Sequence, residues 1–219
     1  MDFEEIEEAR LRAHPGRLDD EDDEDDDEEK KDEDKISRES VLMLDLLRKE
    51  RTIIISEQVT PKLTQRIISQ LLWLDSASEA PIKVYINTPG GSADDGFALY
   101  DMIRFIKAPV FNICVGLNAS AGTLILLGAP KERRLALPNA RIMIHQPSGG
   151  GRGRASDIEI TAEEILKLRQ RANEIIAAET GRSVEQVEKD TDRDYWLSAT
   201  RAKEYGLVSR IIRTLREIQ

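Results

Sequence analysis

The sequence has little of several residue types that stabilise or equip small proteins. Of its 219 residues only one is cysteine and two are histidine, and aromatic residues make up 5%. The single cysteine, Cys114, has no partner for a disulfide within the chain, which excludes a disulfide-stapled secreted domain. Cysteine and histidine also do not cluster at zinc-site spacing, so we expect no metal site. The core must be built mainly from aliphatic and small side chains.

Long apolar stretches are missing as well. No uninterrupted run approaches the roughly 20 residues that cross a bilayer. The first residues, from Met1 to Glu5, lack the basic and apolar pattern of a secretion signal. We therefore expect a soluble, cytoplasmic protein in a reducing compartment, with no membrane contact. The length suits one domain with a substantial core.

Negative charge is concentrated in one segment. Residues 1–35 contain 19 acidic and 6 basic side chains, which leaves 23 of the 42 acidic and 26 of the 32 basic side chains for the rest. Self-repulsion and a shortage of apolar residues predict a disordered acidic tail over residues 1–37, followed by a folded domain over residues 38–219. We interpret the tail as a solubilising extension, with docking to a basic partner as the alternative. No nucleic-acid partner is expected.

Apolar runs and helical patterns alternate along the folded part. Strands are expected at Ile53–Ile55, Lys83–Asn87, Val110–Val115 and Arg141–His145, and helices after Thr60, over Asp95–Ile106 and over Ala121–Leu127. Strand-then-helix alternation with short connections predicts an α/β fold with a largely parallel sheet.

The last third of the chain has a different pattern. Apolar residues at helical spacing between Thr161 and Ile176 predict a long amphipathic helix over Asp157–Glu179, ending at Gly181. The apolar side of this helix either packs on its own sheet or meets a partner, and the pattern leaves both open. The preceding stretch Gly149–Gly153 favours an extended, separable element. Capping signals predict two further, shorter helices, which begin after Ser183 and Ser198.

The two histidines limit where imidazole chemistry can occur. His14 lies in the acidic segment, so a histidine general base would be His145, at the end of an apolar strand. Ser120 lies among small residues at an expected strand-to-helix turn, which is a setting that exposes a nucleophile. A structural histidine and a serine that merely caps a helix are the alternatives.

A glycine turn, Pro89-Gly90-Gly91, follows the strand expected at Lys83–Asn87. Its backbone N–H groups can form an oxyanion hole with the amide of Ala121; an ordinary Pro-Gly turn is the alternative. The turn lacks the Lys-Ser/Thr of a phosphate-binding loop, and no such loop occurs in the sequence. We therefore expect no cofactor and no ATP hydrolysis by this chain.

Four segments, taken together and in order, resemble signature segments of the ClpP family, the proteolytic subunits of Clp proteases. These segments are Tyr85–Gly91, Asn118–Gly122, Leu137–Pro147 and Asp190–Asp194. The resemblance covers roughly residues 44 to 213 and leaves the acidic tail unexplained. It implies the ClpP/crotonase-like fold, an α/β fold in which the helix over residues 157–179 is a projecting handle.

The resemblance implies a catalytic triad. Ser120 is the nucleophile, His145 the general base, and Asp194 the carboxylate that orients and stabilises the imidazolium. Composition alone does not distinguish Asp194 from its charged neighbours.

The resemblance also implies two binding elements around this triad. Gly91 and Ala121 supply the amides of the oxyanion hole. Gly149, Gly150 and Gly151 line a cleft in which an extended substrate pairs as an added strand.

As a family member the chain would be a self-compartmentalised serine endopeptidase, a homo-oligomer of two stacked heptameric rings. Unfolded polypeptides would be delivered by a Clp-type unfoldase, which would hydrolyse the ATP. Two alternatives stay open. One is a noncatalytic ring subunit of a mixed Clp complex, and the other is an acyl-CoA enzyme of the related crotonase fold.

Two departures from the family pattern concern the partner. Lys83 stands where an aromatic residue of the unfoldase-docking pocket is common, while Tyr85, Ile113 and Val115 keep that pocket partly apolar. Either the lysine reaches out to solvent or the partner loop differs. The acidic run also replaces the apolar amino-terminal segment of the family, so we expect pore gating to differ.

Overall fold

The computed structural model describes residues 45–150 and 152–218. Contacts divide the chain after Leu46, and every helix and strand named below lies in the second unit, Leu47–Gln219. The predicted tail over residues 1–37, with His14, and Gly151 of the predicted cleft lie outside the described residues. Among the described helices, none is both long enough and apolar enough to span a bilayer.

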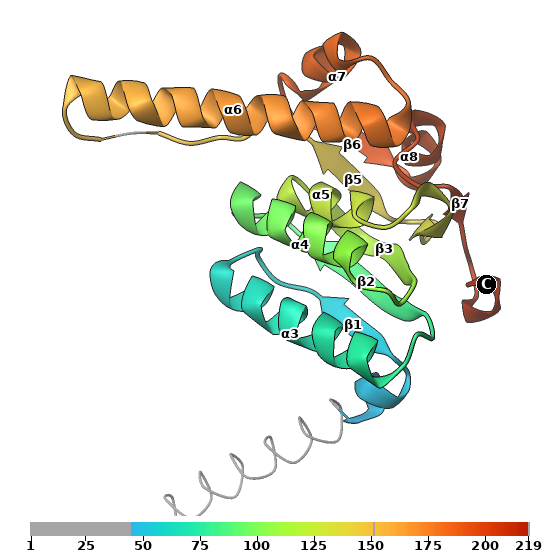
Figure 1. Cartoon of the computed structure of the whole chain (residues 1–219). Coiled ribbons are helices and arrows are strands. Elements are labelled where there is room, and N and C mark those ends of the chain that lie inside the picture. Colours follow the sequence, from blue (N-terminus) through green and yellow to red (C-terminus); the bar gives the residue numbers. More distant parts are fainter. Residues whose placement is uncertain (1–44, 151, 219) are drawn as a thin grey trace, which may run out of the picture. The chain divides into compact units, whose positions relative to one another are not determined.

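A mostly parallel sheet organises the unit (Figure 1). Its parallel path runs in the order β1-β2-β3-β4-β7, formed by Thr52–Ile55, Ile82–Thr88, Val110–Ala119, Arg134–Ala136 and Arg210–Ile211. β3 pairs with β2 along one edge, and its other edge is divided between two strands. Its first half pairs with β4, and its second half pairs with β5 (Arg141–Ile144). β6 (Tyr195–Ser198) then pairs antiparallel with β5.

The helices α3, α7 and α8 begin where the capping signals predict, whereas α4 and α6 each begin two residues before the expected start. They are α3 (Pro61–Ala77), α4 (Ala93–Phe105), α5 (Ala121–Leu127), α6 (Ala155–Thr180), α7 (Val184–Thr191) and α8 (Ala199–Tyr205). The side chains of Thr60, Ser183 and Ser198 each accept a hydrogen bond from a backbone N–H of the first helical turn. These bonds satisfy donors that the helix itself leaves unpaired. Gly181 ends α6 in the left-handed conformation, as predicted.

The core lies between the sheet and the helices α3, α4 and α5, which cover one face of it (Figure 1). Along β3 the side chains alternate between the faces. Asn112 points toward α5, and its Nδ2 donates to the carbonyl oxygens of Ile125 (2.7 Å) and Leu126 (3.1 Å). The alternate residues on the other face belong to a smaller apolar cluster of Phe111, Ile113, Leu135 and Ile212.

The long helix α6 both packs on its own chain and extends away from it (Figure 1). Toward its carboxyl end, Ala172 and Ile176 are buried against the domain. Toward its amino end, three large apolar residues are exposed, namely Ile158 (43%), Ile160 (61%) and Leu166 (59%). Packing on its own domain is therefore observed for the carboxyl-terminal half of the helix, and contact of the amino-terminal half with a partner stays a prediction.

The base of α6 is fixed by a buried ion-pair network. The Glu179 carboxylate accepts hydrogen bonds from the Tyr100 hydroxyl (2.9 Å), from Nη1 of Arg104 (2.8 Å) and from Nη2 of Arg134. The Arg134 side chain is only 1% exposed, and its Nε donates to the carbonyl of Ala129 (2.9 Å). Burial lowers the pKa of Arg134, an effect that Glu179 opposes. Burial and the bond to Glu179 raise the pKa of Tyr100 to about 12, so it stays a donor.

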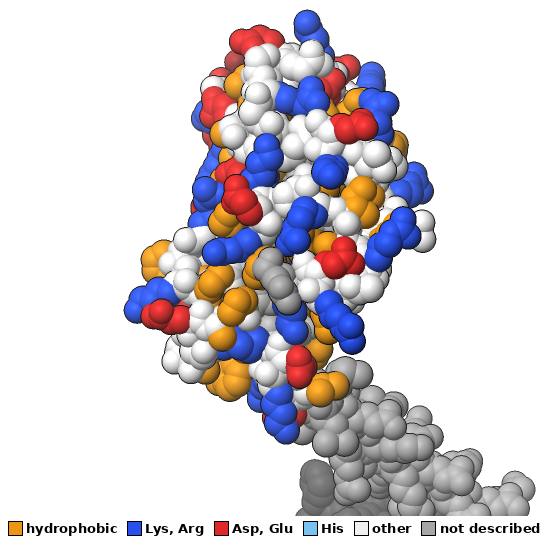
Figure 2. Space-filling view, turned by 90° about the vertical axis from the view of Figure 1, so that its right-hand side faces the viewer, with side chains coloured by type: hydrophobic (Ala, Val, Ile, Leu, Met, Phe, Trp, Pro, Cys, Tyr) orange, Lys and Arg blue, Asp and Glu red, His pale blue; other side chains and the backbone are white. Residues whose placement is uncertain are grey.

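One face of the described surface carries more basic than acidic side chains. Figure 2 shows a face on which Lys and Arg side chains are spread among hydrophobic ones, with fewer acidic side chains. This agrees with the sequence, because all of the excess negative charge lies in residues 1–35 and the other residues have 26 basic against 23 acidic side chains.

Candidate active site

Ser120 occupies the sharp turn between β3 and α5. Its backbone has φ 56° and ψ −122°, a positive φ that is costly for a residue with a side chain. The backbone N–H of Ser120 donates to the carbonyl of Met143 on β5 (2.9 Å), which helps to hold the turn. The Ser120 side chain makes no capping bond to α5. The serine is therefore not a simple helix cap, and its hydroxyl is free to project from the strained turn.

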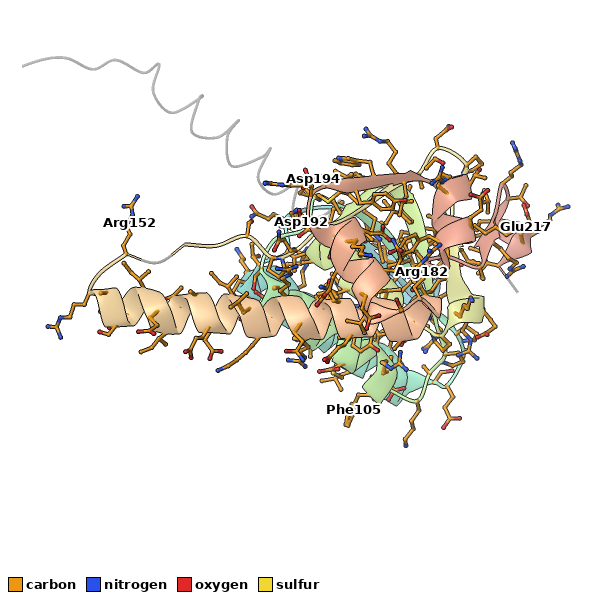
Figure 3. The ribbon with its side chains drawn as sticks, turned by 90° about the horizontal axis from the view of Figure 1, so that it is seen from above. Phe105, Arg152, Arg182, Asp192, Asp194 and Glu217 are labelled. Atoms are coloured by element: carbon orange, nitrogen blue, oxygen red, sulfur yellow. The ribbon has the colours of Figure 1, made fainter. Side chains whose placement is uncertain are left out.

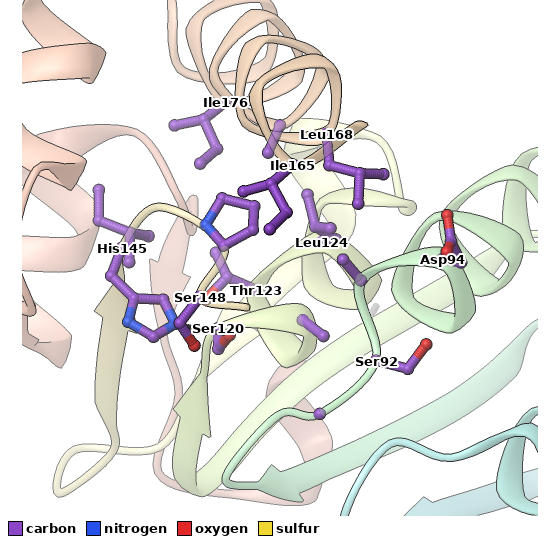
Figure 4. Close-up of a pocket in the computed structure, with 16 residues that line it drawn as sticks. Ser92, Asp94, Ser120, Thr123, Leu124, His145, Ser148, Ile165, Leu168 and Ile176 are labelled. Atoms are coloured by element: carbon purple, nitrogen blue, oxygen red, sulfur yellow. Dashed lines mark hydrogen bonds between the residues drawn. The ribbon is translucent and has the colours of Figure 1, made fainter. Parts of the chain in front are cut away.

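His145 and Asp194 meet at the open end of the β5–β6 pair. The last pair of this antiparallel ladder is Ile144 with Tyr195, so His145 directly follows one strand and Asp194 directly precedes the other. His145 Nδ1 lies 2.9 Å from Asp194 Oδ1, and Figure 3 labels Asp194. His145 Nε2 lies 2.8 Å from Ser120 Oγ, and Figure 4 shows these two side chains. The structure thus brings together all three residues that the resemblance implies for the triad.

The hydrogen bonds fix the role of each imidazole nitrogen. A carboxylate only accepts, so Nδ1 carries the proton toward Asp194 and Nε2 accepts from the Ser120 hydroxyl. The His145 side chain is 22% exposed and that of Asp194 is 59% exposed. The contact between them is consequently open to water on the Asp194 side.

The turn at Gly90 and Gly91 lies directly against Ser120. A Cβ on Gly90 would stand 2.5 Å from the Ala119 carbonyl oxygen, 2.7 Å from Ser120 Cβ and 3.1 Å from the backbone nitrogen of Ala121. Both glycines have positive φ, 91° and 153°. Only glycine permits this backbone to approach so closely in that conformation.

Two backbone N–H groups remain available at this turn. The bridge between Val59 and Gly91 uses the N–H groups of Val59 and Ser92, so the N–H of Gly91 points away from Val59. Ala121 is the first residue of α5, where a backbone N–H has no acceptor within the helix. Gly91, Ser120 and Ala121 line one cavity. The two residues predicted to supply the oxyanion-hole amides therefore line the same cavity as Ser120.

A cavity of about 220 Å³ opens next to Ser120 and His145 (Figure 4). Its apolar wall comes from α5, β5 and α6, through Leu124, Ile144, Ile165, Leu168, Ala172 and Ile176. Asp94, at the start of α4, also lines it. The cavity can hold an apolar side chain next to a group that reacts with Ser120.

Comparison with known proteins assigns this arrangement to a family. A family model described as Clp protease matches residues 35–215. The chain belongs to the Clp protease family. The resemblance in the signature segments is thereby confirmed.

Individual Clp protease relatives cover most of the chain. The ATP-dependent Clp protease proteolytic subunit 3 of Rhizobium johnstonii is 53% identical over 172 residues, which are 78% of this chain and 89% of that protein. Proteolytic subunit 2 of Treponema denticola is 48% identical over 185 residues, covering 84% of this chain and 92% of the relative. A mutant of ClpP1 from Listeria monocytogenes superposes with a TM-score of 0.76 at 44% identity, covering 81% of this chain and 99% of that one. The predicted ClpP-type α/β fold is confirmed.

The glycine-rich stretch of this Clp protease chain borders a second cavity, of about 630 Å³, which is also lined by His145. Gly149 lines it together with His145, Ile165 and Asp194. Around a Cβ built on Gly150 there is open space. The predicted substrate cleft along these glycines stays a prediction, for which the second cavity provides room.

Two parts of the site were not anticipated from the sequence. The sequence predicted Ile165, Leu168 and Ile176 as the apolar side of a long helix, but not as part of a cavity wall. β6 was not expected at all, although it places Asp194 opposite His145. The only signal in the sequence was the short run Tyr195-Trp196-Leu197, whose aromatic residues are common in strands.

The thiol of Cys114 cannot replace Ser120 as a nucleophile. Cys114 is completely buried in β3. Burial raises the pKa of the Cys114 thiol to about 12, so the reactive thiolate does not form near neutral pH. Within residues 45–150 and 152–218, no group of three or more His, Cys, Asp or Glu side chains could hold a metal ion.

Proposed function

We propose that this chain is a serine endopeptidase subunit that cleaves unfolded polypeptides through Ser120, His145 and Asp194. The observation that carries the proposal is the pair of contacts at 2.8 Å and 2.9 Å that links hydroxyl, imidazole and carboxylate in one line. This line ends at a serine in a strained turn beside an apolar cavity. The arrangement provides a base for the hydroxyl and a support for the base.

The first half of the reaction forms an acyl-enzyme. Ser120 Oγ attacks the carbonyl carbon of a peptide bond while its proton passes to His145 Nε2. Asp194 accepts from Nδ1 and stabilises the imidazolium that results. Negative charge develops on the substrate oxygen, where the N–H groups of Gly91 and Ala121 can donate to it.

The acyl-enzyme is complete when His145 gives its proton to the leaving amine, so that the peptide C–N bond breaks and the amine departs as the new amino terminus of one product. The second half of the reaction then releases the acyl group. A water molecule then loses a proton to the same Nε2 and attacks the ester carbon. Ser120 leaves with the proton returned from His145, and the site is restored.

A labelling experiment tests the proposal against its two alternatives. We expect a fluorophosphonate to label the purified protein on Ser120 and to abolish cleavage of a fluorogenic peptide. A noncatalytic ring subunit would give neither labelling nor cleavage. An acyl-CoA enzyme of the crotonase fold would turn over a thioester and leave peptides intact.

The cavity beside Ser120 predicts a preference for apolar residues on the acyl side of the cleaved bond. A glutamate there would lose its hydration among apolar side chains and would meet the like charge of Asp94. We expect kcat/KM for a leucine peptide to exceed that of the matched glutamate peptide by about 100-fold, because roughly 3 kcal/mol of desolvation separates them. Equal values for the two peptides would contradict this role of the cavity.

The fit of the glycine turn predicts a large effect of Gly90→Ala. The added Cβ would collide with Ala119 and Ser120 in a backbone of positive φ. We expect kcat for the peptide to fall about 100-fold and the free energy of unfolding to fall by about 1–3 kcal/mol. The matched control is Gly181→Ala, whose backbone also has positive φ but whose Cβ would meet nothing within 4 Å. That control should lose stability only, and an equal loss of kcat in both variants would contradict the argument.

The proposal includes an assembly of two stacked heptameric homo-oligomeric rings. It is supported by the exposed apolar residues in the amino-terminal half of α6, namely Ile158, Ile160 and Leu166. Monomeric proteins in water rarely expose several large apolar side chains on one element. Electron microscopy of the purified protein should show double rings of sevenfold symmetry. Particles that remain monomeric at micromolar concentration would contradict the assembly.

The proposed unfoldase partner would supply ATP hydrolysis, in keeping with the absence of a phosphate-binding loop in the sequence. An apolar cluster lies on the sheet face opposite α3, α4 and α5, where the partly buried Tyr85 and Val115 pack against the buried Phe111 and Ile113, and it supports a docking role. Lys83 does not stay unpaired in this cluster, because its Nζ lies 3.5 Å from Oε2 of the exposed Glu50. The contact with Glu50 supports the first of the two alternatives, a lysine that extends toward solvent, over a partner loop that differs.

A further inference from the structure

Gln146, the residue after His145, binds the segment that leads to Asp194. Its backbone N–H donates to the Thr191 carbonyl oxygen (2.7 Å). Its side-chain Nε2 donates to the Asp192 carbonyl oxygen (2.8 Å) and lies 3.3 Å from Asp192 Oδ1. The β5–β6 ladder ends at Ile144 and Tyr195, so these bonds continue the attachment beyond the ladder. His145 and Asp194 therefore lie between two clamps, the ladder on one side and Gln146 on the other.

The far side of the Gln146 clamp is firmly anchored. Thr191 is completely buried, and its hydroxyl lies 3.0 Å from Oδ1 of Asn173 on α6 and 2.8 Å from the Val187 carbonyl oxygen. Asn173 is itself buried at 1% exposure. Gln146 thus ties His145 to a point that is fixed by two helices. The segment between this point and Asp194 is short and belongs to neither helix nor strand.

The near side of the clamp is restricted by the backbone. Pro147 follows Gln146 directly, and a proline disfavours the helical conformation for the residue before it. The proline therefore favours an extended backbone at Gln146 and restricts how its side-chain amide is presented. Asp194, by contrast, is 59% exposed at its side chain, so little packing holds it in place.

From these contacts we infer that Gln146 is a positioning residue, which sets the separation of His145 and Asp194 by holding the Asp192 backbone. The inference rests on the proposed peptidase function. Gln146 touches no reacting atom and acts through Asp194. Loss of the side-chain donor would let the segment from Asp192 to Asp194 move, and displacements near 1 Å at a catalytic group cost about 100-fold in rate.

A pair of substitutions separates the donor from the bulk of the side chain. Gln146→Met keeps the length and removes the donor, whereas Gln146→Lys keeps a donor that reaches the Asp192 carbonyl and carboxylate. We expect kcat for a fluorogenic peptide to fall about 10- to 100-fold in Gln146→Met, with KM within about twofold of wild type. Gln146→Lys should retain clearly more of kcat. Rates are measured on assembled protein isolated by gel filtration.

A matched control uses another glutamine of similar bonding. Gln186 on α7 donates from Nε2 to Asp190 Oδ1 (2.9 Å), away from the triad. Gln186→Met should leave kcat and KM unchanged. A fall of kcat in Gln186→Met equal to that in Gln146→Met would overturn the inference, because any lost amide bond would then suffice.

A double-mutant cycle tests whether Gln146 acts through Asp194. In an Asp194→Ala background, Gln146→Met should change kcat by no more than about twofold, because the group that it positions is gone. Full additivity of the two losses would overturn the inference, and so would wild-type kcat in Gln146→Met alone. Failure of the proposed function is a different result: wild-type turnover would then be absent or would survive Ser120→Ala.

Discussion

Ser120→Ala should abolish peptide cleavage while the protein still folds and assembles. The substitution removes the attacking oxygen but leaves Cβ in the strained turn, so the packing against Gly90 is retained. We expect kcat to fall on the order of 10⁶-fold, which is the loss seen when a triad loses its nucleophile. Turnover of a fluorogenic peptide under saturating conditions measures it. Labelling by a fluorophosphonate should disappear in parallel.

The matched control for this prediction is Ser69→Ala. Ser69 is an exposed serine of α3 whose hydroxyl donates to the Gln65 carbonyl oxygen of its own helix (2.9 Å). Its loss should leave turnover unchanged. Substantial peptide cleavage by Ser120→Ala would rule out Ser120 as the nucleophile, and with it the mechanism derived from the line of contacts.

Glu179→Ala should cause the largest loss of stability of any single substitution considered. The change removes the counterion of Arg134, a guanidinium that is 1% exposed and cannot reach water in the folded state. Breaking a buried ion pair by deleting one partner costs about 3–5 kcal/mol, since the remaining charge is left unpaired. Tyr100 also loses its acceptor. Urea unfolding at a fixed protein concentration, with the slope of the transition compared, measures the loss.

An exposed ion pair provides the comparison. Glu204 lies 3.7 Å from Arg201 on α8, with both side chains more than half exposed, at 64% and 65%. Pairs of this kind contribute less than about 1 kcal/mol, so Glu204→Ala should be nearly neutral. If Glu179→Ala unfolded at the same urea concentration as Glu204→Ala, the buried network would not stabilise the base of α6.

Local signals in the sequence were sufficient for much of the fold. Thr60 before Pro61, Ser183 before Gln186 and Gly181 after the long amphipathic run each correspond to an observed helix end. Caps and glycine stops act on neighbouring backbone groups, so they can be recognised without knowledge of the tertiary structure.

Elements that depend on distant partners were harder to predict. β4 (Arg134–Ala136) and β6 were missed, because each is only three or four residues long and is defined by pairing with a remote strand. β3 extends four residues beyond the expected end at Val115, since its second half has a separate neighbour in β5. Periodicity within a strand does not reveal which strand will lie beside it.

The same distinction applies to the candidate site. Ser120 and His145 could be selected from residue type and local setting, because a serine among small residues and a lone histidine at a strand end are conspicuous. Asp194 could not, since three further charged residues surround it and only its pairing opposite His145 distinguishes it. The family resemblance selected it before the geometry was known. The clamp at Gln146 had no sequence signal, as glutamine occurs in many roles.

Because Cys114 is buried, the rate at which its thiol is modified reports unfolding of the domain. Reagents that modify thiols cannot reach a side chain with no exposed surface in the middle of the sheet, and the thiol there stays protonated. Reaction at Cys114 therefore requires the sheet to open, and its rate reports how often that happens. With a single cysteine in the sequence, each labelled molecule records one opening event at one known strand. Variants that loosen the domain as a whole can thus be told apart from those that alter only the site.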